Sequence, residues 1–394
     1  MPKNFNFIFL LNSSILISQI LSLQTMPQGT MDAKINLNSL SYPELENFVT
    51  NELHLSKYRA GQIWNWIWAK NCTDFDAMSD MSKDARQLLH EKAYLFRPVI
   101  EKVSKSKDGT AKFLLRLEDG ELIETVLIPS VAKDGKGRVT QCLSTQVGCA
   151  MACTFCSTGK LGFKRNMTMG EILGQVQAAR AFIEDTNPAH PLIRNLVFMG
   201  MGEPLLNFDN LMKSLETLHH NKGLAFSARR ITVSTCGIQK GLKELGESNL
   251  AYLAVSLHAP TQEKRAMLMP KAAKWQLNDL LSALESYTLG TRECMTLEYL
   301  VLGGVNDTPE DAKELIKICS RLKAKLNLIP YNDTPGSPYK APTPENLLRF
   351  EKALWAKNVT AIIRKSKGQD IEAACGQLRA EYELGKQTED CQSK

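Results

Sequence analysis

Three closely spaced cysteines are the residues of this chain best suited to metal chemistry. Cys149, Cys153 and Cys156 follow the spacing Cys-x3-Cys-x2-Cys. Thiolates are soft ligands that suit iron–sulfur clusters, and three of them on a cuboidal cluster leave one iron with an open position. An open iron can bind an exchangeable ligand. The spacing therefore predicts a [4Fe-4S] site with room for a small molecule on the fourth iron.

Structural zinc is the competing interpretation of the same cysteines. Zinc usually takes four ligands, as two cysteine pairs or as cysteines with histidines. The sequence has no second Cys-x2-Cys pair, and no histidine lies close to residues 149–156. A cluster of buried free thiols is the remaining alternative. Crowded thiols in a chain with ten cysteines favour a metal site in a reducing cytoplasm over a disulfide framework.

The other seven cysteines are scattered along the chain. A lone cysteine is most often a buried free thiol, and the residues alone give no stronger interpretation for any of these seven. They are Cys72, Cys142, Cys236, Cys294, Cys319, Cys375 and Cys391.

Polar or small residues follow several apolar runs, where a parallel barrel places its ligands. Gly202 has no side chain, so the backbone can approach a ligand there, and Glu203 can accept hydrogen bonds from an ammonium group. His258 alone would more often be a hydrogen-bonded structural histidine. The candidate binding residues at these positions are Gly202, Glu203, Ser234, Ser256, Leu257, His258 and Asn332.

The segment that must position these residues alternates between strands and helices. Strands are expected at 139–144, 195–199, 231–234, 253–257, 296–302, 326–330 and 360–364. Thr168 and Glu171 form a capping box that predicts the start of a helix. Repeated strand–helix units imply a parallel sheet, and about six units are too few for a closed eightfold barrel. The fold class is therefore α/β, a partial (β/α)6 barrel over residues 139–380, with the loop 332–344 covering its site.

Residues 36–100 form a small helical module in this interpretation. Ser41, Pro43 and Glu44 indicate a helix start. A stripe of tryptophan and isoleucine over residues 63–68 favours a packed core, and an RNA-binding helical bundle is the alternative. Residues 101–138 contain a β-hairpin and a linker, because two alternating segments, 111–117 and 121–128, flank Asp119-Gly120.

The ends of the chain carry weaker signals. Residues 5–23 are apolar, but they contain polar residues and lack a small-residue cleavage site, so a signal peptide or membrane span is not favoured. We interpret residues 1–35 as a disordered leader or an over-extended start, with Met26 or Met31 as the true first residue. Residues 381–394 are expected to be a C-terminal tail, and no stable membrane association is expected.

Charge permits a nucleic-acid partner without requiring one. The 394 residues carry 48 Lys and Arg against 42 Asp and Glu, a formal net charge of +6. Many soluble proteins with this balance bind no nucleic acid. Basic residues flank the expected strand ends and are candidates for phosphate contacts. They are Lys160, Lys164, Arg165, Arg229, Arg230, Arg364, Lys365 and Lys367.

Four long motifs resemble a known family, and the resemblance extends over nearly the whole chain after about residue 36. They lie at 146–159 (QVGCAMACTFCSTG), 199–207 (MGMGEPLLN), 256–260 (SLHAP) and 373–378 (AACGQL). The Cys-x3-Cys-x2-Cys spacing after a strand resembles the radical S-adenosylmethionine (SAM) superfamily. Together the motifs resemble the RlmN family of RNA adenine methyltransferases. Family members act on carbon 2 of an adenine in 23S rRNA and of an adenine beside the anticodon in certain tRNAs.

The resemblance implies a role for each cysteine and for one carboxylate. Cys149, Cys153 and Cys156 would hold the cluster, and two SAM molecules would be used per turnover. Cys375 would accept a methyl group, and its methylene radical would add to carbon 2 of an adenine flipped out of its stack. Cys142 would resolve the adduct, leaving a transient Cys142–Cys375 disulfide. Glu124 resembles the proton acceptor of the family. The spacer between Glu124 and Cys142 is a few residues longer in this chain than in the family.

The same resemblance implies the remaining partners and leaves alternatives open. The seven candidate binding residues would bind SAM, and an electron donor such as flavodoxin would reduce the cluster in the cytoplasm. One alternative is a Cfr-type enzyme, which methylates carbon 8 of the same rRNA base. Another is a non-catalytic RNA-binding or structural iron–sulfur protein, which would leave Cys142 and Cys375 without a role.

Overall fold

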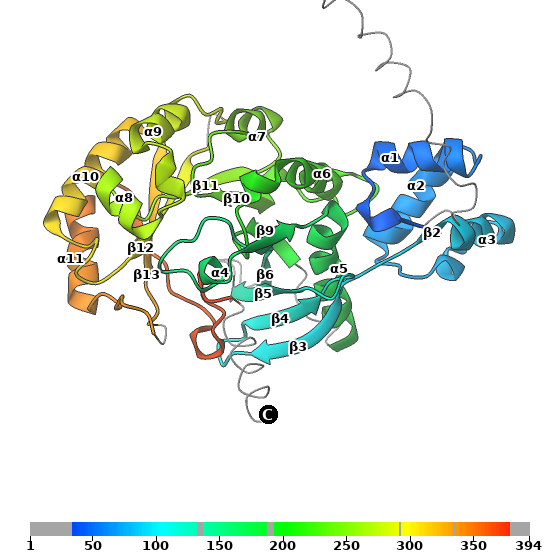
Figure 1. The fold of residues 1–394 in the computed structure, drawn as a ribbon, viewed down its shortest axis with the longest axis horizontal. Coiled ribbons are helices and arrows are strands. Elements are labelled where there is room, and N and C mark those ends of the chain that lie inside the picture. Colours follow the sequence, from blue (N-terminus) through cyan, green and yellow to red (C-terminus); the bar gives the residue numbers. More distant parts are fainter. Residues whose placement is uncertain (1–33, 132–136, 187–192, 291–292, 334–335, 379–394) are drawn as a thin grey trace, which may run out of the picture.

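A ten-stranded sheet runs through the centre of this computed structural model, which describes residues 34–131, 137–186, 193–290, 293–333 and 336–378 (Figure 1). The strand order is β14-β13-β12-β11-β10-β9-β6-β5-β4-β3. The strands are β3 (Val99–Lys105), β4 (Ala111–Arg116), β5 (Leu122–Val131), β6 (Gly137–Cys142), β9 (Ile193–Phe198), β10 (Ile231–Thr235), β11 (Tyr252–Ser256), β12 (Met295–Val301), β13 (Ala324–Pro330) and β14 (Ala361–Ile363).

The half of the sheet from β6 to β14 is parallel and confirms the predicted partial barrel. Neighbouring strands here all pair in parallel. Strands β14 and β3 are the opposite edges of the whole ten-stranded sheet, so the barrel stays open. Helices follow each strand from β6 to β13, and α9, α10 and α11 lie along one side of this half in Figure 1. They are α5 (Met169–Thr186), α6 (Phe208–His219), α7 (Leu242–Ser248), α8 (Gln262–Leu268), α9 (Leu277–Glu285), α10 (Pro309–Arg321) and α11 (Pro344–Trp355).

The half from β3 to β5 is antiparallel. The predicted hairpin is confirmed as β4 and β5, and Asp119 Oδ1 accepts the backbone N–H of Glu121 in its turn at 3.1 Å. The sequence did not predict β3, which adds a third strand. This strand carries Glu101, Lys102 and Lys105 on exposed positions and therefore lacks a clear apolar alternation. Since β5 pairs antiparallel with β6, the extension continues the barrel sheet directly.

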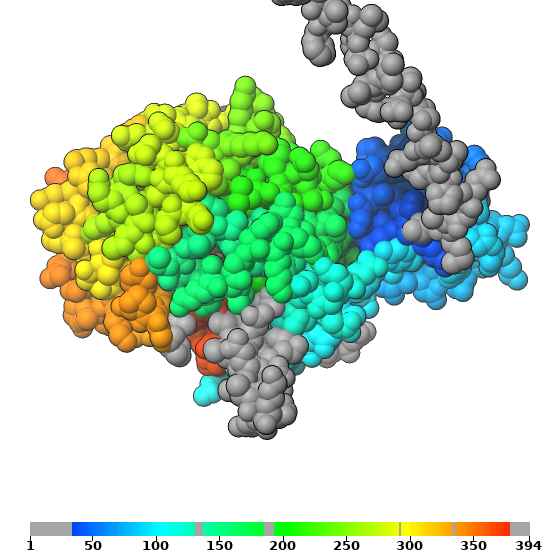
Figure 2. All heavy atoms as spheres, viewed as in Figure 1, coloured from blue at the N-terminus to red at the C-terminus, as the bar shows by residue number. Residues whose placement is uncertain are grey.

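The N-terminal module contains α1 (Tyr42–Asn47), α2 (Tyr58–Trp64) and α3 (Lys83–Lys92), beside the short strands β1 (Ile35–Asn36) and β2 (Ala93–Tyr94). Ser41 and Glu44 form a capping box at the start of α1, as predicted. Trp64 and Trp68 are fully buried, which confirms that the tryptophan stripe is largely core. The module, in blue, lies at one end of the molecule in Figure 2.

Helix α5 joins the module to the barrel. Its predicted capping box is confirmed, since Thr168 and Glu171 exchange hydrogen bonds of 2.8 and 3.2 Å. Further along α5, Gln177 bonds the Asn38 side chain and the Ile67 carbonyl. Arg180 donates to the carbonyls of Trp68 and Ala69 at 2.7 and 2.8 Å. The two parts are thus held together by buried side-chain contacts to backbone.

Some expectations fall where the structure gives no description. The expected leader, apart from Lys34 and Ile35, and the tail at 381–394 lie outside the described residues. Among the helices of the described ranges, none is long and apolar enough to cross a membrane.

Candidate active site

A cavity at the carboxyl ends of the parallel strands brings together six cysteines from several parts of the chain. They are Cys142, Cys149, Cys153, Cys156, Cys236 and Cys375. Five of the seven candidate binding residues also line it, namely Gly202, Glu203, Ser234, Ser256 and His258. Leu257, Asn332 and Glu124 are not among the lining residues. We call Cys149, Cys153 and Cys156 the cysteine triad, and Cys142 with Cys375 the transfer pair.

The cysteine triad lies on a loop between β7 (Gln146–Gly148) and the short helix α4 (Ser157–Lys160). Strand β7 pairs with β8 (Phe163–Asn166), and the Cys149 N–H donates to the Gly162 carbonyl at 2.7 Å. Burial raises the pKa of Cys149 to about 12 and the pKa of Cys153 well above its usual value. Such thiols stay protonated at neutral pH unless a metal or a cation stabilises the thiolate.

The spread of the triad argues against a single zinc ion. Thiolates on one tetrahedral zinc lie about 3.8 Å apart, given the usual Zn–S distance. In the described part of the chain, only Asp74, Asp76 and His90 place three such ligand atoms within 4.8 Å of one another. At least two sulfur atoms of the triad are therefore too far apart for one ion. Three soft thiolates of this kind would instead hold an iron–sulfur cluster.

A buried arginine supplies positive charge beside the triad. Arg265 on α8 is 0% exposed, and within the described residues its hydrogen bonds go to neutral acceptors, including the carbonyls of Leu257 and Cys236. Its Nε is buried without a partner. Burial lowers the pKa of Arg265, whereas negative charge on Cys236, Cys153 or Glu203 would raise it. Because an unpaired buried cation is costly, the site fits an anionic occupant such as a thiolate-bound cluster.

Glu203 is a buried carboxylate fixed by backbone donors. Its Oε1 accepts from Leu205 N at 3.0 Å, and its Oε2 accepts from Cys236 N at 2.8 Å. Burial raises the pKa of Glu203, and these hydrogen bonds oppose the rise. Gly202 has φ +101°, and a side chain there would come within 2.6 Å of Gln146. The glycine is thus required for close packing against Gln146 as well as for its backbone conformation.

Ser234, Ser256 and His258 are neutral polar residues of the lining. The hydroxyls of Ser234 and Ser256 lie 3.4 Å apart. His258 accepts the backbone N–H of Leu300 on Nδ1 at 3.0 Å, so its proton is on Nε2. Burial, with help from Arg265, lowers the pKa of His258 to about 3. This histidine is therefore a neutral hydrogen-bond donor toward the cavity rather than a proton carrier.

The transfer pair meets from two distant parts of the chain. Cys142 ends β6 and is 8% exposed, whereas Cys375 lies on an exposed position of the C-terminal loop. Burial raises the pKa of Cys142 to about 12, the negative charge of a Cys375 thiolate raises it further, and Arg364 opposes both. Arg364 also lines the cavity. The sequence placed this arginine among the residues facing RNA, whereas the structure places it beside the transfer pair.

The loop that carries Cys375 is held on both sides. After the cysteine, the Gly376 carbonyl accepts the N–H of Ser157 at 2.6 Å, which fixes the loop to the triad segment. Before it, the Gly368 N–H donates to Asp108 Oδ2 at 3.0 Å, and Asp370 Oδ2 accepts the Lys107 N–H at 3.1 Å. Asp108 and Lys107 belong to the β3–β4 turn. The strand that the sequence missed therefore helps to position the exposed cysteine.

Glu124 lies on β5 behind the cavity lining. It is buried and forms an ion pair of 3.3 Å with Lys112, which is equally buried. Lys112 Nζ also donates to the Glu372 carbonyl at 3.2 Å, three residues before Cys375. Residues alternate along a strand, so Glu124 shares its face with Val126 and Ile128, which do line the cavity. A buried cation thus connects the predicted proton acceptor to the loop of the transfer pair.

Two predicted binding residues have other contacts. The Leu257 side chain is fully buried, and its carbonyl accepts from Arg265. Asn332 bonds Ser366 at 3.3 Å and Gln369 at 2.6 Å, within the segment that leads to Cys375. The sequence analysis missed Glu298 and Cys236, which both line the cavity. A glutamate inside the apolar run of β12 was the signal available for Glu298.

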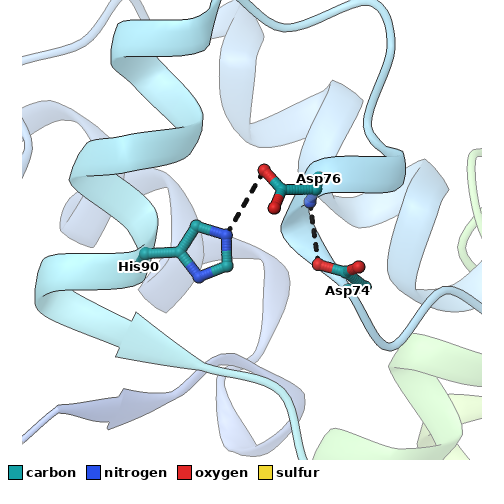
Figure 3. A group of neighbouring side chains, drawn as sticks. All are labelled: Asp74, Asp76 and His90. Atoms are coloured by element: carbon teal, nitrogen blue, oxygen red, sulfur yellow. Dashed lines mark hydrogen bonds and ion pairs between the residues drawn. The ribbon is translucent and has the colours of Figure 1, made fainter.

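Several basic or metal-ligating groups outside the cavity have structural partners. Lys164 pairs with Glu121, and Arg165 pairs with both Asp119 and Glu171. Asp74, Asp76 and His90 approach one another in the N-terminal module (Figure 3). There Asp74 caps a short helical turn through Asp76 N at 2.9 Å, and His90 lies 3.5 Å from Asp76. These hydrogen bonds and ion pairs account for the cluster within the local fold.

Comparisons with known proteins agree on one family. Residues 35–95 match the ribosomal RNA large subunit methyltransferase N-terminal domain, and residues 143–319 match the radical SAM superfamily. A dual-specificity RNA methyltransferase RlmN of Nitratidesulfovibrio vulgaris is 65% identical over 87% of this chain and 94% of its own length. One of Lawsonia intracellularis is 56% identical over 88% of this chain and 97% of its own. The crystal structure of a radical SAM methyltransferase from Sphaerobacter thermophilus has a TM-score of 0.80 and 40% identity, covering 88% of this chain and 100% of its own.

Proposed function

The chain belongs to the RlmN family of radical SAM RNA methyltransferases, and on this premise we propose that it methylates carbon 2 of adenine in 23S rRNA and in certain tRNAs. The observation that supports this proposal most directly is the convergence of the cysteine triad and the transfer pair on one cavity. A structural iron–sulfur protein would need the triad alone.

The cysteine triad would hold a [4Fe-4S] cluster, because three thiolates are soft ligands suited to iron–sulfur chemistry. SAM would bind beside it on Gly202, Glu203, Ser234, Ser256 and His258, with Leu257 and Asn332 contributing from their surroundings. Glu203, held by two backbone donors, would accept a hydrogen bond from the SAM ammonium group. When bound, the cluster and SAM would supply the methyl group and the radical that activates it. An electron donor such as flavodoxin would complete the system in the cytoplasm.

The residues of the transfer pair would carry the carbon and then release it. Cys375 would hold the methyl group on its sulfur and form the bond to carbon 2 of the adenine. Glu124 would take the proton that leaves carbon 2. Cys142 would attack the Cys375 sulfur, and the bond between this sulfur and the transferred carbon would break. The carbon would keep the electron pair and take up a proton to become the methyl group, while a Cys142–Cys375 disulfide forms. Because burial holds the pKa of Cys142 at about 12, Arg364 would be needed to stabilise its thiolate.

Nucleoside mass spectrometry of rRNA and tRNA, isolated from cells with and without the gene, tests the activity. We expect 2-methyladenosine in both RNA classes only when the gene is present. Finding 8-methyladenosine without 2-methyladenosine would instead support a Cfr-type reaction. Finding neither product would support a non-catalytic protein.

The Cys142→Ala variant tests the roles within the transfer pair. Addition to the base would proceed while release failed, so the RNA would stay attached to Cys375. We expect a crosslinked protein–RNA species on denaturing gels, absent from a Cys142→Ala/Cys375→Ala double variant. A single variant that turns over without any crosslink contradicts the two-cysteine scheme.

A further inference from the structure

Glu298 on β12 is a carboxylate in the cavity wall to which neither the sequence analysis nor the proposed chemistry gives a role. It is 4% exposed and lines the cavity. Its Oε1 accepts a hydrogen bond from Asn327 Nδ2 at 3.0 Å. Its Oε2 is buried and has no hydrogen-bond partner among the described residues. Within the parallel sheet, Glu298 is aligned with Ser256 on one side and with Asn327 on the other.

An unpaired oxygen in this position indicates a missing donor. Buried polar atoms are almost always paired, and an acceptor left without a donor is unfavourable. Burial raises the pKa of Glu298, whereas Arg364, Asn327 and Lys325 lower it. Because Glu298 lines the cavity, a bound ligand whose N–H or O–H group reached Oε2 would complete the hydrogen bonds of this carboxyl group.

The position of Glu298 relative to the transfer pair indicates which ligand supplies the missing donor. Cys142, Cys375 and Glu298 line the same cavity, and Arg364 lines it as well, so the carboxylate and the reacting cysteines face one enclosed space. In adenine, only N1 and C6 separate the exocyclic amino group from carbon 2. A base whose carbon 2 faces Cys375 therefore presents its amino group to the nearby wall. At position 6 adenine has a donor and guanine has an acceptor.

We propose that Glu298 Oε2 accepts a hydrogen bond from the exocyclic amino group of the target adenine. Glu298 is thus a specificity-determining residue that favours adenine and disfavours guanine, whose O6 would face the carboxylate without a shared proton. The inference rests on the proposed function and adds the group that identifies the base. A ribose hydroxyl or the ammonium group of SAM is the alternative source of the donor, and the experiment separates the two.

The test is a double-mutant cycle between enzyme and RNA. Cluster-loaded wild-type, Glu298→Leu and Glu298→Gln enzymes are assayed on a synthetic RNA stem-loop that carries adenosine or purine riboside, which lacks the amino group, at the target position. We expect the wild type to lose roughly ten- to hundredfold in kcat/KM on purine riboside, the range for a buried acceptor without its donor. Glu298→Leu should process both RNAs at similar rates. Glu298→Gln keeps an acceptor oxygen and should retain most of the preference for adenosine.

The controls keep the outcomes distinct. Glu351 on α11 is a second buried carboxylate, which accepts the Ile363 N–H at 3.1 Å outside the cavity, so Glu351→Leu should keep the wild-type ratio between the two RNAs. Equilibrium binding of SAM to each variant should be unchanged. A wild type that uses purine riboside as well as adenosine overturns the inference, even if Glu298→Leu does not fold. Weaker SAM binding by Glu298→Leu, with an unchanged RNA ratio, assigns the oxygen to the cofactor and also overturns it. Absence of 2-methyladenosine from the wild type on adenosine RNA overturns the proposed function as well.

Discussion

The cysteine triad and the transfer pair lie in one cavity but are built in different ways. The triad comes from eight consecutive residues, 149–156, on a partly buried loop beside the β7–β8 hairpin. The transfer pair joins the end of β6 to a loop near the C-terminus, and Cys375 is exposed. A short motif can thus present three ligands locally, whereas the transfer pair depends on the whole barrel and on the antiparallel extension.

The difference corresponds to what each group would have to do. A cluster needs fixed ligands, and the triad is surrounded by buried charge on Glu203 and Arg265. A cysteine that receives a methyl group and delivers it to RNA needs access to more than one partner. Cys375 lies on an exposed position of a loop that is held by hydrogen bonds to Ser157 on one side and to Asp108, Lys107 and Lys112 on the other.

The largest expected effects come from removing one cysteine from the triad and, separately, one from the transfer pair. Cys153→Ala should abolish iron binding and every activity, because two thiolates cannot replace three. Cys375→Ala should keep the cluster and SAM cleavage but lower RNA methylation by about a thousandfold or more, as removal of a covalent nucleophile does. Iron content, 5′-deoxyadenosine release and 2-methyladenosine are the three measurements.

Cys319 provides the control for this pair of variants. It is a half-buried thiol on α10 that does not line the cavity, and burial raises its pKa to about 11. Cys319→Ala should change none of the three measurements. Loss of the cluster in Cys375→Ala would contradict the separation into two groups.

The next effect concerns the buried pair behind the transfer pair. Lys112→Met removes the ion pair with Glu124 and the bond to the Glu372 carbonyl. We expect the free energy of unfolding to fall by about 3 kcal/mol, the usual result of breaking a buried pair on one side. RNA methylation should fall while SAM cleavage persists. Chemical denaturation and the two product assays measure this.

Lys102 on β3 is the matched control, because it is exposed on the same extension. Lys102→Met should resemble the wild type in both assays. If Lys112→Met lowers stability but leaves the rate of RNA methylation intact in the folded fraction, Lys112 has only a structural role.

A smaller effect is expected at the triad, from its buried arginine. Arg265→Met removes positive charge that would stabilise the extra electron of a reduced cluster. We expect a more negative reduction potential, measured by redox titration followed with electron paramagnetic resonance.

Arg180 is the control for Arg265, because it is an arginine that also donates to backbone carbonyls but lies outside the cavity. It also donates to two carbonyls, those of Trp68 and Ala69, but it lies on α5 away from the cavity. Arg180→Met should lower stability without changing the potential. If the reduction potential of the cluster is unchanged in Arg265→Met, the arginine has only a structural role through its bonds to backbone carbonyls.

The sequence predicted those parts of the fold that depend on local patterns. Alternating strands and helices predicted the partial barrel, and Asp119-Gly120 predicted the β4–β5 hairpin. Strand β3 was missed because its exposed charged residues hide the alternation, and its pairing is decided by the β4 edge. Sheet order and the contact between α5 and the N-terminal module depend on long-range packing, which periodicity does not encode.

The candidate site shows the same limit. The triad could be recognised from its spacing, but the transfer pair could not be distinguished from ordinary free thiols without the family motifs. Glu298 and Arg364 looked like an ordinary strand residue and a surface cation. Their place in the cavity follows from the pairing of β12 with β11 and β13 and from the short strand β14, which precedes Arg364. Such residues become visible only when the sheet is assembled.

The smallest expected effect tests how firmly the Cys375 loop is held. Partial burial raises the pKa of Asp108, but hydrogen bonds from Thr110, Gly368 and Ser106 outweigh it and bring the pKa below its ordinary value. Asp108→Ala should therefore lower the free energy of unfolding at neutral pH by about 1 kcal/mol or less, because solvent weakens bonds to an exposed carboxylate. A carboxyl group with a lowered pKa stabilises the fold above its unfolded pKa of about 4, and this contribution is lost as the pH falls below that value. The difference between wild type and variant should shrink accordingly in acid.

Hydrogen exchange makes this last test specific to the loop. The Gly368 N–H, which donates to Asp108, should exchange faster in Asp108→Ala at neutral pH, while amides of the triad segment stay protected. Asp119→Ala, in the equivalent turn between β4 and β5, loses a similar turn bond and the ion pair with Arg165 but no contact to this loop. It should leave the exchange of Gly368 unchanged. If both variants raise the exchange rate of the Gly368 N–H equally, the antiparallel extension stabilises the loop as a whole. If only Asp108→Ala raises it, a single carboxylate at the β3–β4 turn sets how far Cys375 can move relative to the fixed triad.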